Sequence, residues 1–355
     1  MRQSLGFFLL LTLCNLCTQP ASAQQNHEWS EVAPGVHAVL QPGAQRFDDS
    51  NSVVLIGDED VLVVDAQASA DQVRALLAKL REMTNNPVRA LVNTHWHGDH
   101  TQGNSLYVEA FGEQLEIVAH TSVLEDIPGR AKPALDEQID TWQEAIEAAE
   151  ERLKAGVDEE GAPMNKEEKK DLERRLERSR KRVDDWRQQR WALPTRTFGD
   201  RLLLQQGSRT IELLHLPGHT RGDVVLFLPA EKVLVTGDLL DDLPYGGHGY
   251  PRQWIRSLRR LRELDFDTII PGHGAVRRGR EHLDLVLAMF ESIVGQVDAA
   301  IENGDDLETT KQKVNLETFR QQLAGDDASA TSAFESFIPA TIERAYLEAK
   351  GELPD

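Results

Sequence analysis

The chain has almost no cysteine. Its 355 residues contain two, Cys14 and Cys17, and both lie in a segment that has the layout of a bacterial secretory signal. Arg2 supplies the positive start, an apolar run follows, and Ala21-Ser22-Ala23 forms a small-residue cleavage site. Removal of residues 1–23 would leave no disulfide and no thiolate metal ligand. We therefore expect stability to come from packing and from bound metal.

Long hydrophobic runs are also missing. The apolar run near the start is too short to span a bilayer, and neither cysteine follows the small residues that a lipoprotein signal usually needs. We therefore expect a periplasmic or secreted protein without membrane anchoring.

Positive charge is scarce as well, since 39 Lys and Arg oppose 59 Asp and Glu, for a formal net charge of −20. Such a surface would repel nucleic acids and anionic membranes, which leaves a small molecule as the expected substrate.

Histidine and aspartate, by contrast, are concentrated in the run Thr94-His95-Trp96-His97-Gly98-Asp99-His100. Imidazole and carboxylate are ligands that divalent zinc, iron and manganese accept readily. The preceding residues 88–93 predict a short buried strand, and Gly98 stands where a tight turn is needed. The ligands therefore leave a strand end and fold back toward one point. The alternative is a polar, histidine-rich loop without metal.

Four further motifs place a polar residue at the end of an apolar run. Pro-Gly turns precede His219 and His273, Asp238 follows Thr-Gly, and Asp65 ends the run that begins at Val61. Each motif alone is weak, because a lone Pro-Gly-His is more often a plain turn. Their joint occurrence in this order, each after a predicted strand, strongly indicates a metal site.

Strands that alternate with helices predict an α/β fold of stacked layers. Strands are expected at residues 36–40, 52–56, 61–65, 88–93, 117–120, 201–204, 211–214, 224–228, 233–235 and 268–270, and helices at 71–83 and 253–263.

Residues 135–192 break this pattern, because they are highly charged and helical in composition. Apolar residues recur at intervals of three and four residues on both sides of Gly161-Ala162-Pro163, and Asn165 is placed to cap a second helix. The spacing predicts an inserted antiparallel helical hairpin. It is either a structural arm, a lid over the site, or a contact with a protein partner. Residues 281–355 predict a C-terminal helical extension.

The ordered series of motifs resembles the metallo-β-lactamase-fold hydrolase superfamily over about residues 30–134 and 195–280. The resemblance implies a domain at 24–280, interrupted by the hairpin. Its fold would be an αβ/βα four-layer sandwich of two mixed β-sheets, with the metal site at one edge. It also implies roles. His95, His97 and His219 would hold a first metal, and Asp99, His100 and His273 a second. Asp238 would bridge the two metals, as in the glyoxalase-II-like branch, and Asp65 would orient ligands from outside.

The same resemblance implies two zinc ions per chain, with iron or manganese as alternatives. A water shared by two cations loses its proton near neutral pH and would attack an ester, thioester, lactone or amide bond. Asp99 and Asp238 would lower the repulsion between the cations and are the expected catalytic residues. Two other functions stay open: an iron-dependent redox enzyme acting on sulfur or oxygen species, and a non-catalytic secreted binding protein.

The loop after Asp238 is rich in glycine and aromatic residues. In this fold it would border the active site, so Tyr245, His248 and Tyr250 are expected to contact substrate or stabilise an oxyanion, unless the loop is only structural. The best-known secreted β-lactamases carry a cysteine where this chain has Asp238. The name of the fold therefore does not give the activity.

Overall fold

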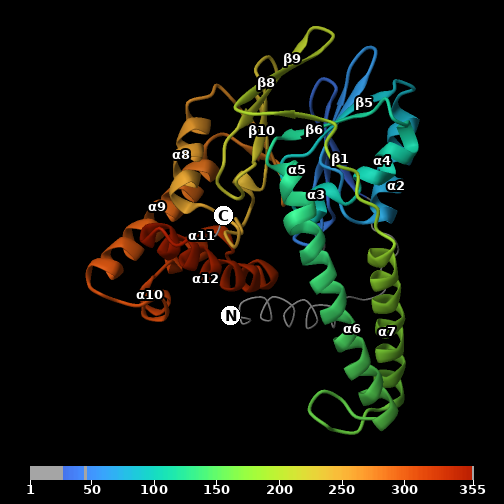
Figure 1. The fold of residues 1–355 in the computed structure, drawn as a ribbon, viewed down its shortest axis with the longest axis vertical. Coiled ribbons are helices and arrows are strands. Elements are labelled where there is room, and N and C mark those ends of the chain that lie inside the picture. The colour runs from blue at the N-terminus through green and yellow to red at the C-terminus, as the bar shows by residue number, and fades with distance from the viewer. Residues whose placement is uncertain (1–26, 44–45, 354–355) are drawn as a thin grey trace. The chain divides into compact units, whose positions relative to one another are not determined.

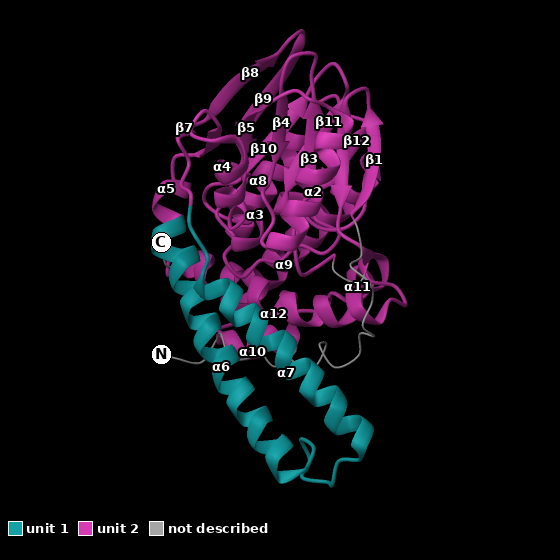
Figure 2. Ribbon diagram, turned by 90° about the vertical axis from the view of Figure 1, so that its right-hand side faces the viewer, with its two compact units in different colours: residues 1–25, 127–191 teal, residues 26–126, 192–355 magenta. Residues whose placement is uncertain are grey.

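The structure is a computed structural model that describes residues 27–43 and 46–353. The expected signal segment, residues 1–23, lies outside the described residues. The described chain forms two compact units, shown in Figure 2. The hairpin unit covers residues 127–191, and the sandwich unit covers the rest. Among the helices of the described residues, none combines the length and apolar character that a membrane span requires.

In the described part of the chain, the first sheet of the sandwich unit has seven strands that lie in sequence order. β1 to β4 pair antiparallel, and β4 to β7 pair parallel. The strands are β1 (Glu28–Ala33), β2 (Val36–Leu40), β3 (Ser52–Ile56), β4 (Val61–Val64), β5 (Val88–Val92), β6 (Glu116–His120) and β7 (Arg196–Phe198).

The second sheet, again among the described residues, has six strands in the order β13-β12-β11-β10-β9-β8. β11 and β12 are parallel and the other pairs are antiparallel, so both sheets are mixed. The strands are β8 (Arg201–Gln206), β9 (Arg209–His215), β10 (Val224–Leu228), β11 (Val233–Gly237), β12 (Thr268–Pro271) and β13 (Arg277–Arg278).

Helices cover the outer faces of both sheets (Figure 1). The first sheet carries α2 (Ala70–Met83) and α4 (Asn104–Phe111), and the second carries α8 (Pro251–Arg262) and α9 (Glu281–Glu302), against which α12 (Ala328–Lys350) packs. The shorter helices are α3 (Gly98–Thr101), α5 (Val123–Asp126), α10 (Leu307–Lys313) and α11 (Glu317–Leu323). The expected helical extension after residue 280 is therefore present.

Alternating side chains on the strands build three apolar layers. Val53, Leu55 and Val64 of the first sheet meet Leu226 and Val235 of the second sheet between the two sheets. The residues that alternate with them face outward, onto α2 and α4 on one side and onto α8 and α9 on the other. Since successive side chains of a strand point to opposite faces, strands buried on both faces read as continuous apolar runs. The predicted αβ/βα four-layer sandwich is confirmed.

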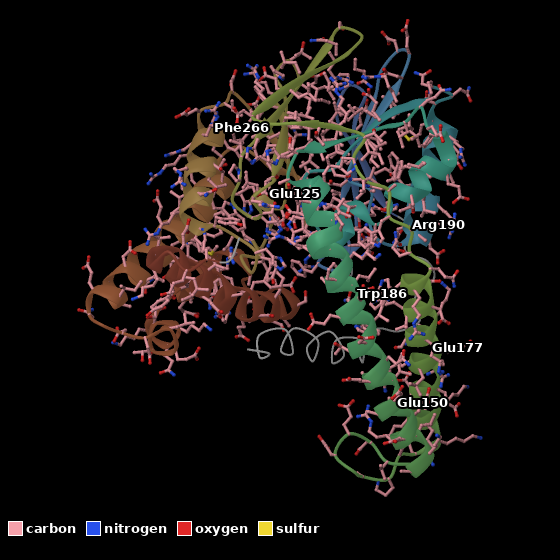
Figure 3. All side chains as sticks on the ribbon, in the orientation of Figure 1. Glu125, Glu150, Glu177, Trp186, Arg190 and Phe266 are labelled. Atoms are coloured by element: carbon pink, nitrogen blue, oxygen red, sulfur yellow. The ribbon has the colours of Figure 1, made fainter. Side chains whose placement is uncertain are left out.

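The hairpin unit consists of a π-helical turn (Ile127–Ala131) followed by α6 (Lys132–Ala155) and α7 (Lys166–Arg187). Trp186 of α7 packs edge-to-face on Trp142 of α6, with ring centroids 5.3 Å apart (Figure 3). Asn165 caps α7 in a capping box with Glu168. The unit begins about eight residues before the expected boundary at 135. α6 accommodates a proline, Pro133, in its first turn, where no helical hydrogen bond is lost.

Candidate metal centre

The His-rich run lies at the carboxyl end of β5, a central strand of the first sheet. After His95 the chain turns, and the one-turn helix α3 begins at Gly98, so that His100 points back toward His95 with the two ring centroids 4.1 Å apart. The side-chain amide of Asn93 fixes this return, since its Nδ2 donates to the carbonyl oxygen of His100 at 2.9 Å. Asn93 is itself paired with Asn104 of α4.

A bulge at the end of β11 directs Asp238 into the same region. The pairing of β11 with β12 shifts between Val235 and Gly237, and Gly237 has a φ of +49°. A Cβ at Gly237 would lie 2.6 Å from Oγ1 of Thr94, and one at Gly272 would collide with the Asp238 carboxylate. Glycine at these two positions therefore allows β11 and β12 to bring Asp238 against the end of β5.

The turn that carries His219 is fixed by a carboxylate that sequence reasoning missed. Asp223 accepts hydrogen bonds from the backbone N–H of Gly218 and Thr220 and from the hydroxyl of Thr220, the shortest at 2.5 Å. Burial raises the pKa of Asp223 to about 7, although these hydrogen bonds oppose that shift. No spacing rule connects a lone aspartate five residues after Gly218 with such a role.

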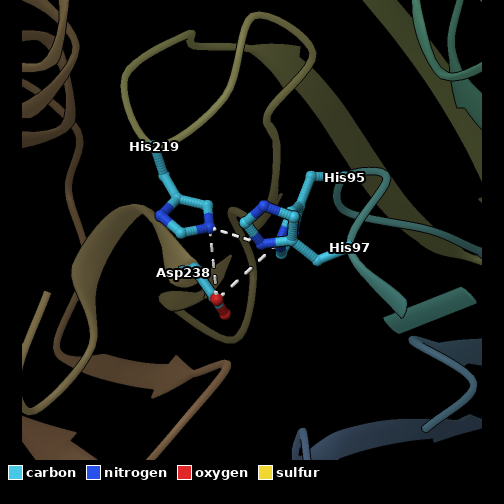
Figure 4. Close-up of side chains that lie close together, drawn as sticks. All are labelled: His95, His97, His219 and Asp238. Atoms are coloured by element: carbon cyan, nitrogen blue, oxygen red, sulfur yellow. Dashed lines mark hydrogen bonds and ion pairs between the residues drawn. The ribbon is translucent and has the colours of Figure 1, made fainter. Parts of the chain in front are cut away.

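His95, His97 and His219, with Asp238, form the first group of converging side chains (Figure 4). Nδ1 of His97 lies 2.9 Å from Nε2 of His219. The Oδ2 atom of Asp238 is 3.4 Å from Nε2 of His219 and 3.7 Å from Nε2 of His95. Three nitrogens and one carboxylate oxygen thus face one point.

Asp99, His100 and His273 form the second group. Oδ2 of Asp99 is 3.0 Å from Nε2 of His273 and 3.4 Å from Nε2 of His100. Asp238 reaches this group as well, with its Oδ1 atom 3.1 Å from Nε2 of His100 and its Oδ2 atom 3.6 Å from Nε2 of His273. The carboxylate of Asp238 therefore lies between the two groups.

The donor atoms of both groups fit divalent cations. Among the described residues, Nε2 of His95, Nε2 of His100 and Oδ1 of Asp238 are buried and have no hydrogen-bond partner. The last two atoms are close in space but not in hydrogen-bonding geometry. Buried polar atoms are rarely left unpaired in a native protein, and neutral imidazole with carboxylate is a donor set typical of zinc.

Oxygen acceptors outside the two groups fix the tautomer of three histidines. Nδ1 of His219 donates to the carbonyl oxygen of Tyr245 at 2.8 Å, and Nδ1 of His273 donates to that of Arg46 at 3.0 Å. Nδ1 of His100 donates to Oδ2 of Asp65 at 2.8 Å. Because Nδ1 of each of these rings keeps its proton for the hydrogen bond, Nε2 is the atom that offers a lone pair when a metal binds.

Asp65 occupies the orienting position that the sequence predicts. Besides His100, its carboxylate accepts the backbone N–H and the hydroxyl of Thr94, each at 2.8 Å. The same hydroxyl lies 3.1 Å from Nδ1 of His95. Asp65 has a φ of +58°, in the left-handed region that few non-glycine residues adopt. Its backbone is thus held in an uncommon conformation at the point where it contacts the ligand residues.

The pKa values of the histidines divide along the two groups. Burial, together with the neighbouring imidazoles, holds the pKa values of His95 and His97 well below the ordinary value and lowers that of His219. Burial alone would also lower the pKa values of His100 and His273, but Asp238 and Asp99 outweigh it. They raise the pKa of His273 to about 10 and that of His100 well above its ordinary value.

The aromatic loop lies beside the first group. Nδ1 of His248 is 2.9 Å from Nε2 of His97, and the ring centroid of Trp96 is 5.1 Å from that of His248. Tyr245 contacts His219 through its carbonyl oxygen. Tyr250 comes directly before α8 and donates its N–H to the carbonyl oxygen of Gly218 at 2.7 Å. The loop thus supports the histidines from outside, whereas the expected contact of these side chains with substrate stays a prediction.

Asp241 is a further residue that sequence reasoning missed. It is buried, lies within ligand distance of Asp238 and His273, and accepts the backbone N–H of His273 at 2.8 Å. Burial and the charge of Asp238 raise its pKa well above the ordinary value. The only signal in the sequence is its place three residues after Asp238, which does not distinguish it from an ordinary loop aspartate.

The sequence matches the metallo-beta-lactamase superfamily over residues 46–273. A linear primary-alkylsulfatase of Pseudomonas sp. (strain ATCC 19151) is 26% identical over 250 residues, which cover 67% of this chain and 44% of that protein. An acyl-coenzyme A thioesterase of Gallus gallus is 30% identical over 90 residues, which cover 22% of this chain and 31% of that protein. The chain thus spans less than half the length of either relative.

Solved structures show the same fold. A stereoselective inverting sec-alkylsulfatase from Pseudomonas sp. superposes with a TM-score of 0.59 at 15% sequence identity, over 92% of this chain and 51% of that one. The expected resemblance in family and in fold is confirmed.

Proposed function

Because the chain belongs to the metallo-beta-lactamase superfamily, whose matched relatives are hydrolases, we propose that it is a hydrolase with two metal ions in its site. One observation carries the proposal. The carboxylate of Asp238 lies 3.1 to 3.7 Å from ring nitrogens of four histidines, two in each group. This one carboxylate can therefore contact a cation in the first group and a second cation in the other group at the same time.

We assign the first cation to His95, His97 and His219 and the second to Asp99, His100 and His273, with Asp238 shared. Nitrogen and carboxylate donors without thiolate favour zinc, and iron or manganese are alternatives. Two bound cations supply Lewis-acid polarisation of a substrate carbonyl or ester oxygen and lower the pKa of a shared water. Asp65 and the carbonyl oxygens of Tyr245 and Arg46 keep the rings in the orientation that this task needs.

Asp99 and Asp238 differ in their access to solvent. The side chain of Asp99 is 26% exposed and that of Asp238 is 7% exposed. Despite burial, the facing imidazoles of His100 and His273 hold the pKa of Asp99 well below its ordinary value, so Asp99 is ionised. Its backbone is fixed by the hydroxyl of Ser50, which donates to the carbonyl oxygen of Asp99 at 2.7 Å. We assign proton transfer to Asp99 and the bridging role to Asp238.

The proposed substrate is a small molecule with an ester-type bond. The relative matched over most of the chain is an alkylsulfatase and the other is a thioesterase, which makes sulfate esters and thioesters the first classes to test. Carboxylic esters, lactones and amides follow. The layout of residues 1–23 supports a periplasmic or secreted location. The hairpin unit is proposed as a lid or as a contact for a protein partner.

The test is a hydrolase panel on the purified, zinc-loaded protein, with alkyl sulfates, acyl-coenzyme A thioesters, carboxylic esters, lactones, phosphoesters and nitrocefin. We expect zinc-dependent turnover of at least one class. His97→Ala should abolish it, and His37→Gln, a histidine change on strand β2, should not. A wild-type protein that binds no metal even after reconstitution would contradict the proposal. Bound iron with a visible absorption spectrum would instead favour the redox alternative.

A further inference from the structure

Helix α12 lies outside the region that matches the superfamily, yet it contacts the loop beside the first group of histidines. We call residues 245–250 the support loop. Nε of Arg344 in α12 donates to the carbonyl oxygen of Gly249 at 2.7 Å, and its guanidinium lies 5.2 Å from the ring centroid of Tyr250. Phe337 of the same helix packs on Tyr245 with ring centroids 5.3 Å apart. One helix thus holds both ends of the support loop.

The support loop in turn contacts two of the three histidines of the first group. The carbonyl oxygen of Tyr245 accepts from Nδ1 of His219, and Nδ1 of His248 lies 2.9 Å from Nε2 of His97. In each ring the other nitrogen faces the point where the group converges. The position of the support loop therefore sets how both rings are turned.

Close packing leaves the support loop little freedom. The N–H of Gly249 donates to the carbonyl oxygen of Gly246 at 2.9 Å, and a Cβ at Gly246 would collide with Thr341 of α12. Arg344 is only 9% exposed, and a buried guanidinium is costly unless it is hydrogen-bonded. Its bond to Gly249 thus satisfies a buried cation and fixes the backbone next to His248.

From this chain of contacts we infer that Arg344 is a positioning residue for the first-metal histidines and acts through the support loop. The inference rests on the proposed function, because it takes His95, His97 and His219 as the holders of a cation. Without Arg344 the backbone at Gly249 loses its donor, and the contacts that orient His97 and His219 loosen. The first metal should therefore bind more weakly, while the second, which these contacts do not reach, should bind as before.

A purely structural role for Arg344 gives a different result. If the arginine only anchors α12, its loss would lower the stability of the chain and affect both metals equally. Arg280 offers a matched control. Its guanidinium also donates to backbone carbonyl oxygens, those of Arg262 and Leu264, and lies 4.5 Å from the ring centroid of Phe266. It contacts α8 and the chain that follows rather than the support loop.

The experiment measures cobalt affinity and the visible cobalt spectrum in a His273→Ala background, where the first metal remains. We expect Arg344→Ala to lower the affinity for the first metal about 10- to 100-fold, as is typical when a contact that orients ligand residues is lost. The visible cobalt spectrum should change as well. Arg344→Lys, which keeps a donor, should recover part of the affinity. Arg280→Ala should change the affinity less than about 3-fold, within the range of ordinary surface effects. The second metal, measured in a His97→Ala background, should be insensitive to both changes.

Equal effects of Arg344→Ala and Arg280→Ala, or equal weakening of both metals, would overturn the inference and leave the proposed function intact. A wild-type chain that binds no cobalt or zinc would overturn both.

Discussion

The two groups of the candidate metal centre contain similar residues, but their histidines differ in charge when no metal is bound. The first group holds neutral imidazoles, because burial and neighbouring histidines keep the pKa values of His95 and His97 low. In the second group burial has the same tendency, but Asp99 and Asp238 outweigh it and raise the pKa values of His100 and His273. The placement of carboxylates, more than the number of histidines, sets this difference.

The contrast predicts different binding behaviour. A neutral imidazole binds a cation without releasing a proton, whereas an imidazolium must lose its proton first. The first group is therefore prepared for a metal near neutral pH, and the second exchanges protons for a metal. In the metal-free chain, protonated His100 and His273 balance the charge of the carboxylates that later hold the cation.

Asp238 contacts both groups, so its removal should have the largest effect on metal binding and turnover. Asp238→Ala should lower turnover by about three orders of magnitude, because both groups lose the carboxylate that they share. The second metal should weaken more than the first, which keeps three histidines. Zinc stoichiometry and turnover measure this. Asp242→Asn is the control, because Asp242 lies in the same loop but is paired with Arg277. Full zinc occupancy with unchanged turnover in Asp238→Ala would show that Asp238 does not bridge the two metals.

Single histidine changes should separate the two groups. His273→Ala removes one of two imidazoles from the second group, and the chain should retain about one zinc instead of two. His97→Ala should remove the first metal and the activity together. Elemental analysis after gel filtration gives both numbers. Two retained zinc ions in either variant would show that the altered histidine is not a ligand.

The pH dependence should differ between the groups. The pKa of His273 is raised to about 10, so this ring is protonated at pH 7 to 8, and the proton that zinc displaces from it makes the affinity change about tenfold per pH unit. The second metal should therefore bind at least about tenfold more strongly at pH 8 than at pH 7, and the raised pKa of His100 acts in the same direction. The first metal, bound by imidazoles whose pKa values are lowered, should change little. Calorimetric zinc titrations at the two pH values test this, and equal pH slopes at both metals would contradict it.

Asp65 supports the second group, and its change should have a smaller effect. Asn tolerates the positive φ of this residue, so Asp65→Asn should preserve the backbone. Asn has one acceptor oxygen where Asp65 has two, so it cannot accept from both Thr94 and Nδ1 of His100, and we expect the second metal to bind about 10- to 100-fold more weakly. Asp60→Asn, which removes a charge paired with Arg89 on the surface, should change the affinity less than about 3-fold. Equal affinities for the two variants would exclude a role for Asp65 in metal binding.

The hairpin unit should have the smallest effect on either metal. Replacing residues 132–190 with a short flexible linker keeps Ala192, whose carbonyl oxygen accepts from Asn104 beneath the His-rich turn. Both zinc ions should remain, with affinities within about 3-fold of the wild-type values. Lost metal binding would make the hairpin part of the core of the fold. Retained metal with altered substrate preference would identify it as a lid.

Sequence reasoning located the residues of both groups because the signal is local. Each candidate ligand residue lies at or shortly after the end of an apolar strand, and the strand ends meet at one edge of the sandwich. The sequence did not predict strand β1, an edge strand without a buried side chain, the three-residue strand β7 or the two-residue strand β13.

Most residues that position the candidate ligand residues could not be predicted from the sequence. Arg46 acts through its carbonyl oxygen, which any residue would provide. Asp223 and Asp241 hold backbone N–H groups of the turns near His219 and His273, and neither has a characteristic spacing. Arg344 reaches the support loop from a helix 95 residues further along the chain than Gly249. Contacts of this kind depend on tertiary packing, which periodicity does not encode.

The central claim is that two metals share Asp238. Anomalous X-ray diffraction at the zinc edge, on crystals of the zinc-loaded protein, tests it most directly. The account predicts two anomalous peaks, one coordinated by His95, His97 and His219 and one by Asp99, His100 and His273, with the Asp238 carboxylate contacting both. A single peak, or two peaks of which Asp238 contacts only one, would contradict it.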